Sequence, residues 1–121
     1  MKKAFLIIST GFIILYSCSK DSGGNGGGGG GTTLNCATVT NKAFALDVAP
    51  IIASACATNS GCHATGSGNG PGPLTTYSQI FAARSSIRSS VNAGTMPKNS
   101  SITTAQKNSI LCWIDSGAPN N

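Results

Sequence analysis

Two side chains of rare types carry most of the chemistry in this sequence. Beyond the N-terminal seventeen residues, the chain has one histidine, His63, and one methionine, Met96. His63 directly follows Cys62, and Met96 directly precedes Pro97. An imidazole nitrogen and a thioether sulfur are both ligands of transition metals. The pattern therefore predicts a site that binds a metal-containing group through His63 and Met96.

The order of a Cys-His pair and then a Met-Pro pair is typical of a covalently attached haem, in which imidazole and thioether bind opposite faces of the iron. Cys62 is predicted to form one thioether bond to the porphyrin, and Cys56 the second. The usual spacing is Cys-x-x-Cys-His, whereas residues 57–61 separate the two cysteines here. Because both axial positions of the iron would be filled, we expect single-electron transfer and no enzymatic activity.

Residues 1–17 have the features of an export signal. Lys2 and Lys3 precede an apolar stretch, residues 4–16, which is too short to span a bilayer stably. The stretch leads into Leu-Tyr-Ser and then Cys18, a sequence that resembles the lipobox of bacterial lipoproteins. In that family the cysteine is acylated and becomes the mature N-terminus. The alternative is an ordinary secretory signal with a chance cysteine.

Residues 18–35 are predicted to form a flexible linker, because every residue from 23 to 31 except Asn25 is a glycine, which has no side chain to bury. Residues 36–121 then remain for one small domain, which needs covalent reinforcement at this size. Together with the lipidation signal, this organisation predicts a protein tethered by lipid to the bacterial cell envelope. We expect it at the outer membrane, facing either the periplasm or the cell surface.

The predicted domain is weakly basic. Five cationic and two acidic side chains give residues 36–121 a net charge of +3. The charges form no basic stripe and few aromatic residues lie between them, which argues against nucleic-acid binding. A mildly positive surface suits an acidic redox partner protein, and we expect the domain to be a monomer.

Apolar periodicity predicts an all-α domain of three short helices with long loops. In the first helix, Asp47 is the expected N-cap and Pro50 lies in the first turn, and the helix leads directly into Cys56. Residues 59–72 are rich in Gly, Ser, Asn and Pro and are predicted to form a loop.

The second and third helices carry start and stop signals at both ends. The second helix is predicted to begin with a capping box of Thr76 and Gln79 and to end before Gly94. The third is predicted to begin with a capping box of Thr103 and Gln106 and to end before Gly117. The apolar faces of the first and third helices are expected to pack together. Tyr77 and Trp113 are interpreted as packing residues of this core.

The order of these motifs resembles the small cytochrome-c-like lipoproteins common in Bacteroidetes, and it is similar to the cytochrome-c-like domains of planctomycete proteins. The resemblance extends over residues 44–120. Five segments carry it: residues 47–52, Cys62 with His63, residues 74–77, Met96 with Pro97, and residues 113–119. It implies haem c as the cofactor, with His63 as the proximal ligand and Met96 as the distal one. By position Cys62 matches the second thioether cysteine, and Cys56 matches the first when a longer loop is allowed.

The cysteine count permits two arrangements once Cys18 is assigned to lipid. Thioethers from Cys56 and Cys62 leave Cys36 and Cys112, which flank the domain, to form a disulfide in an oxidising compartment. Alternatively, the four cysteines form two disulfides, and the domain is a haem-free, disulfide-stapled module with a binding or structural role. A zinc site is less favoured, because Cys56, Cys62 and His63 lack a fourth ligand.

Overall fold

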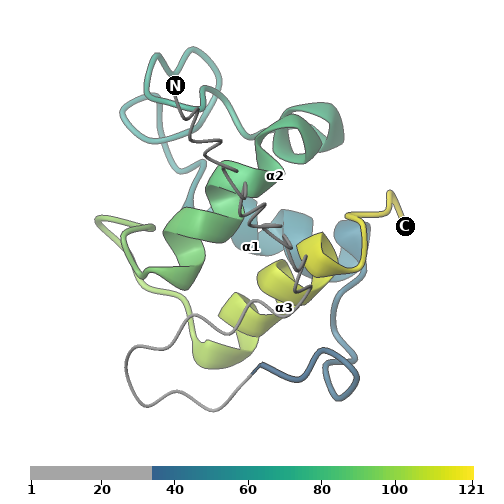
Figure 1. Ribbon diagram of the computed structural model, residues 1–121. Helices are drawn as coiled ribbons and strands as arrows, with labels where there is room; N and C mark the ends of the chain where they lie inside the picture. The colour runs from purple at the N-terminus through teal and green to yellow at the C-terminus, as the bar shows by residue number, and fades with distance from the viewer. Residues whose placement is uncertain (1–33) are drawn as a thin grey trace, which may run out of the picture. The chain divides into compact units, whose positions relative to one another are not determined.

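A computed structural model of the protein describes residues 34–121. In chain order they form a π-helical turn, η1 (Phe44–Val48), and three α-helices, α1 (Ala49–Ala55), α2 (Tyr77–Asn92) and α3 (Thr104–Asp115). Within this part of the chain there is no strand, which confirms the predicted all-α class. The helices α2 (green) and α3 (yellow-green) pack against each other, and α1 (blue-green) lies behind them in the view of Figure 1.

The first helical segment begins earlier than the sequence predicts. Asp47 is not its N-cap, because η1 begins at Phe44 and its N-cap is Ala43. The Asp47 carboxylate lies in the first turn and accepts a hydrogen bond of 2.8 Å from the Ala43 N–H. Phe44 and Val48 are both buried, so the apolar face starts one turn earlier and its burial outweighs the local capping preference. Pro50, which cannot donate to the preceding turn, follows the wider π turn directly.

Both predicted capping boxes are confirmed. At the start of α2, Thr76 Oγ1 accepts the Gln79 N–H at 3.3 Å, and the Gln79 side chain accepts the Thr76 N–H at 3.1 Å. Thr103 and Gln106 repeat this reciprocal pair at the start of α3. At the N-terminus of each of these two helices, two backbone N–H groups that have no partner within the helix are therefore satisfied.

The two long helices also end where the sequence predicts. Asn92 is the last residue of α2, and Gly94 has a φ of +71°. Asp115 is the last residue of α3, and Gly117 has a φ of +97°. A left-handed conformation just beyond a helix favours glycine, because the missing Cβ removes the steric penalty.

The hydrophobic core lies between α3, α2 and η1. Helix α3 packs against both other elements, so the expected pairing of the first and third helical segments is made chiefly through η1. Most core side chains come from these elements and from α1: Phe44, Val48, Ile51 and Ile52; Ile80, Ala83, Ile87 and Val91; Ile110, Leu111 and Trp113.

Aromatic side chains connect the core to the end of the chain. The Phe44 ring lies 5.0 Å from the Tyr77 ring and 5.4 Å from the Trp113 ring, measured between centroids. Trp113 Nε1 donates to the Pro119 carbonyl, and the Tyr77 hydroxyl donates to the Ala118 carbonyl, both at 2.9 Å. The polar groups of the buried Trp113 ring and the partly buried Tyr77 ring therefore both have a partner, and the prediction that Tyr77 and Trp113 are packing residues is confirmed.

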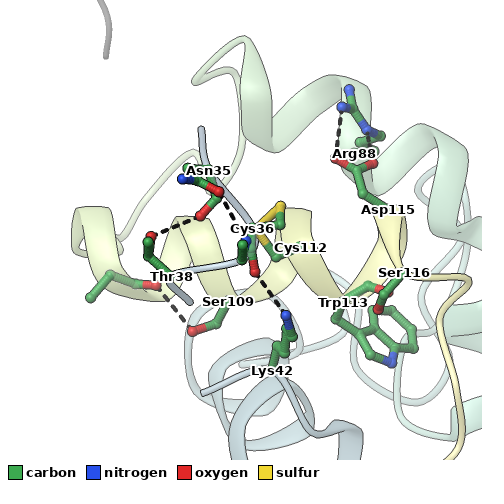
Figure 2. The surroundings of a disulfide bond; sticks show 12 residues. Asn35, Cys36, Thr38, Lys42, Arg88, Ser109, Cys112, Trp113, Asp115 and Ser116 are labelled. Atoms are coloured by element: carbon green, nitrogen blue, oxygen red, sulfur yellow. Dashed lines mark hydrogen bonds and ion pairs between the residues drawn. A yellow bond between two sulfur atoms is a disulfide. The ribbon is translucent and has the colours of Figure 1, made fainter. Parts of the chain in front are cut away.

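The predicted disulfide between Cys36 and Cys112 is present. Its Cα atoms are 5.3 Å apart, and it joins the segment before η1 to the buried face of α3 (Figure 2). The bond links residues 76 positions apart in the sequence. By the loop-entropy model, a crosslink of this length contributes on the order of 4 kcal/mol to stability. This bond supplies the covalent reinforcement that a core of this size needs.

The predicted export signal, the lipidation residue Cys18 and the linker lie outside the described residues, apart from the last two linker positions. A search for membrane-spanning helices in residues 34–121 finds none of sufficient length and apolar character.

Candidate functional site

A cavity of about 800 Å³ brings together the four residues singled out in the sequence. Cys56, Cys62, His63 and Met96 all line it. The first three belong to the segment that follows α1, and Met96 belongs to the loop between α2 and α3. The volume lies within the range of roughly 300–1,000 Å³ that is typical of cofactor and small-molecule sites.

The cavity has an apolar interior and a polar edge. Its buried apolar lining comes from α1, α2 and the loop between them: Ile52, Leu74, Ile87 and Val91. Exposed polar residues also contribute to the lining: Thr58, Asn59, Asn69, Ser86, Lys98, Asn99 and Ser100. This combination suits a largely apolar group that carries polar substituents.

His63 is held in a defined orientation. Its side chain is 7% exposed, and Nδ1 lies 3.0 Å from the Gly72 carbonyl oxygen. Because a carbonyl only accepts hydrogen bonds, this contact selects the tautomer with a proton on Nδ1 and a lone pair on Nε2. Among residues 34–121, no group forms a hydrogen bond with Nε2. The ring therefore has the arrangement of a metal ligand, with one nitrogen anchored and the other available.

The long spacing between Cys56 and Cys62 is folded into a closed turn. The His63 N–H donates to the Cys56 carbonyl at 3.0 Å, and the Cys62 N–H donates to the Asn59 carbonyl at 3.0 Å. The extra residues thus loop out, and the backbone of the Cys-His pair returns to Cys56.

Both cysteines of the cavity are free thiols. Burial raises the pKa of Cys56 above its ordinary value, and the nearby Cys62 raises that pKa further. Burial acts in this direction because it disfavours the charged thiolate. In the structure, the four cysteines of the domain thus form one disulfide, Cys36–Cys112, and leave one pair of thiols at the cavity.

Hydrogen bonds to backbone carbonyls fix the loop that carries Met96. The Thr95 N–H donates to the Ser90 carbonyl at 3.0 Å, which attaches the start of the loop to α2. The Ser100 hydroxyl donates to the Ala55 carbonyl at 2.9 Å, which attaches its far side to the end of α1. Met96 itself is partly buried and lines the cavity.

Three contributors to the site are not apparent from the sequence. Gly72 supplies the carbonyl that orients His63, and its φ of +98° is accessible mainly to glycine. The buried Ser67 hydroxyl donates to the Cys62 carbonyl, and Asn69 Nδ2 donates to the Gly61 carbonyl at 2.8 Å. The composition of this segment indicates only a loop, whereas its side chains make the hydrogen bonds that shape the loop.

The other charged residues considered in the sequence have hydrogen-bond partners outside the cavity. Arg88 forms a bidentate pair with Asp115, at 2.6 and 3.0 Å, and Arg84 donates to the Phe81 carbonyl at 2.7 Å. Neither arginine lines the cavity. Asp47 accepts the Ala43 N–H. No group of three or more His, Cys, Asp or Glu side chains in residues 34–121 is placed to hold a metal ion.

Comparisons with models of protein families, with curated proteins and with solved structures find no match to this chain.

Proposed function

We propose that this protein is a small, membrane-tethered c-type cytochrome that transfers single electrons through a covalently bound haem. One observation carries the proposal: Cys56, Cys62, His63 and Met96 line the same cavity, although they come from two separate loops. The cavity also combines a cofactor-sized volume with an apolar interior.

Each of these side chains has a role in holding the group. The free thiols of Cys56 and Cys62 are available for thioether bonds to its two vinyl substituents. His63 offers Nε2 to the iron while Nδ1 stays bonded to the Gly72 carbonyl, which fixes the ring orientation and increases ligand basicity. Met96 offers a thioether sulfur. Haem bound in this way supplies a one-electron Fe(III)/Fe(II) couple.

The ligand set favours electron transfer over catalysis. If His63 and Met96 both held the iron, the bound group would keep no coordination position for a substrate. A soft thioether ligand stabilises Fe(II) and raises the reduction potential. The buried apolar lining, Ile52, Leu74, Ile87 and Val91, limits the access of water to the bound group.

The N-terminal motif completes the proposal. Lipid on Cys18 would anchor the domain to the cell envelope, and the glycine-rich linker would let it reach a redox partner protein. Replacing Cys18 with Ala should move the protein from the membrane fraction to the soluble fraction. A variant that stays in the membrane fraction with its leader intact would show that the leader itself is the anchor.

The decisive experiment is expression of the full chain in two bacterial hosts, one with and one without the cytochrome c maturation system. We expect a red product with Soret and α bands only in the first host. The haem should remain attached after denaturation in acid, and mass spectrometry of haem-bearing peptides should show thioethers at both Cys56 and Cys62. A colourless product from a host that matures a control cytochrome would overturn the proposal. It would support the haem-free, disulfide-stapled alternative.

A further inference from the structure

One cationic side chain of the domain differs from the other four. Lys42 Nζ donates to the Cys36 carbonyl at 2.8 Å, as Figure 2 shows, and Lys107 Nζ donates to the Asn92 carbonyl at 2.9 Å. Both lysines therefore have a polar partner supplied by the backbone, and neither lines the cavity.

The two arginines are committed as well. Arg88 pairs with the carboxylate of Asp115 (Figure 2). Arg84 donates to the Phe81 carbonyl at 2.7 Å, and its guanidinium carbon lies 4.1 Å from the centroid of the Phe81 ring. Both guanidinium groups are thus satisfied away from the cavity.

Lys98 is the exception. It has no hydrogen-bond or ion-pair partner in the part of the chain that the structure describes, and it is the one charged residue that lines the cavity there. Asp47 and Asp115, which could have neutralised it, are bonded to the Ala43 N–H and to Arg88. The edge of the cavity therefore carries an unneutralised positive charge.

The neighbouring residue adds to the anion-binding character of this edge. The Asn99 side chain also has no hydrogen-bond partner within residues 34–121, and it lines the cavity beside Lys98. An ammonium and an amide offer several N–H donors and suit a carboxylate. The long stem of a lysine allows its charge to follow such a group.

We infer that Lys98, assisted by Asn99, binds a propionate carboxylate of the cofactor and so sets which edge of the group faces solvent. This inference rests on the proposed function, because haem carries its two propionates on one edge of an otherwise apolar ring. The apolar side of the cavity then receives the ring, and the polar edge receives the charge.

The test compares holoproteins of the full chain that carry Lys98→Gln, Lys98→Arg or Lys107→Gln. Lys107→Gln is the matched control, because it removes the same charge outside the cavity. Resonance Raman spectroscopy would follow the propionate bending band, and voltammetry at fixed pH and ionic strength would follow the reduction potential. The near-infrared charge-transfer band would verify that Met96 ligation is intact in each variant.

We expect Lys98→Gln to shift the propionate band and to lower the potential, because the propionate charge is then no longer compensated and stabilises Fe(III). Lys98→Arg should stay close to wild type on both measurements, and Lys107→Gln should change neither. An unchanged band in Lys98→Gln would overturn the inference and leave the proposed function standing. If Lys98→Gln leaves the propionate band unchanged but makes the rate of electron transfer less dependent on salt than in wild type, the inference would also be overturned. That result would assign Lys98 to the binding of an acidic partner protein. A colourless wild-type protein would overturn the proposed function and this inference with it.

Discussion

Cysteine has different roles in the two regions of this domain. In the helical core, Cys36 and Cys112 are joined by a disulfide that connects the start of the domain to α3. At the cavity, Cys56 and Cys62 remain free thiols, although they lie close enough for one to influence the pKa of the other. The same residue type thus serves stability in one region and is left available for chemistry in the other.

The nitrogen-bearing side chains repeat this contrast. In the core, Trp113 Nε1 donates to the Pro119 carbonyl at 2.9 Å, which leaves the indole no unused polar group. At the cavity, His63 Nε2 and the Lys98 side chain have no hydrogen-bond partner within residues 34–121.

Buried polar groups in folded proteins normally have hydrogen-bond partners. Residues 34–121 follow this pattern throughout, since none of their buried side-chain nitrogen or oxygen atoms lacks a partner. The thiols of Cys56 and Cys62, the Nε2 atom of His63 and the side chain of Lys98 have no partner within residues 34–121, and all four residues line one cavity. The two regions therefore differ in whether their reactive groups are bonded within the protein or left accessible at a cavity.

The largest effect is expected for His63. Replacing His63 with Ala should abolish the haem-bearing protein, because the variant loses both the iron ligand and the Cys-His unit that haem attachment requires. The helical core should form as in wild type, because His63 belongs to the loop that follows α1. Absorbance of the purified protein measures the first effect, and far-UV circular dichroism measures the second.

Two results would contradict this separation of roles. Normal haem content in His63→Ala would remove His63 from the ligand set. Loss of helical structure with the haem content unchanged would make His63 a core residue and not a ligand. Met96→Ala in the same host is the control, because the thioether bonds do not involve Met96.

The second effect concerns the core alone. Reducing the Cys36–Cys112 bond in the holoprotein should lower the free energy of unfolding by about 4 kcal/mol, because the unfolded chain regains the entropy of a long loop. Haem should stay attached, because thioether bonds resist thiol reductants. Denaturant titration with and without reductant measures the difference, and the double variant Cys36→Ser/Cys112→Ala should reproduce most of it. A loss of haem on reduction would show that the two regions are not independent.

How far the sequence predicts this molecule depends on the range of the interactions. The capping boxes of α2 and α3 are local, since Thr76 and Gln79 need only be three residues apart, and both were predicted correctly. The start of the first helical segment was predicted wrongly, because it depends on the packing of Phe44 against Tyr77 and Trp113. Contacts between residues so far apart in the chain leave no local signal.

The features of the site likewise divide into those with a local sequence signal and those that depend on long-range contacts. His63 and Met96 could be singled out because each is rare in the sequence and has a distinctive neighbour. Both were expected at one site, and they line the same cavity, whereas the Gly72 carbonyl that orients His63 and the unpaired charge of Lys98 could not be predicted. A backbone acceptor has no sequence signature, and the isolation of one lysine is visible only when the partners of the others are known.

The third prediction sharpens the assignment within the cavity. Met96→Ala should retain covalent haem but lose the weak near-infrared band of Fe(III)–thioether ligation. Its reduction potential should fall, because the soft ligand that favours Fe(II) is removed. Absorption spectroscopy and voltammetry check these outcomes. An unchanged band in the variant would remove Met96 from the ligand set and leave His63 and the cysteines in place.

The smallest expected effect concerns the Cys56 thiol in the haem-free protein. Because burial and the neighbouring Cys62 raise its pKa, less of Cys56 is thiolate at a given pH near neutrality than in the denatured chain. Iodoacetamide should therefore label Cys56 more slowly in the folded protein, and the rate should keep rising at a higher pH than it does in denaturant. The same shift means that folding favours the protonated thiol, so stability should fall as the pH rises through the folded-state pKa.

Peptide mass spectrometry over a pH series measures the rate at which Cys56 is labelled. Cys62→Ala should reduce the difference between the folded and the denatured protein without removing it, because burial is the larger cause of the raised pKa. Equal labelling of Cys56 in the folded and the denatured protein would show that this thiol is as accessible to solvent as any surface cysteine.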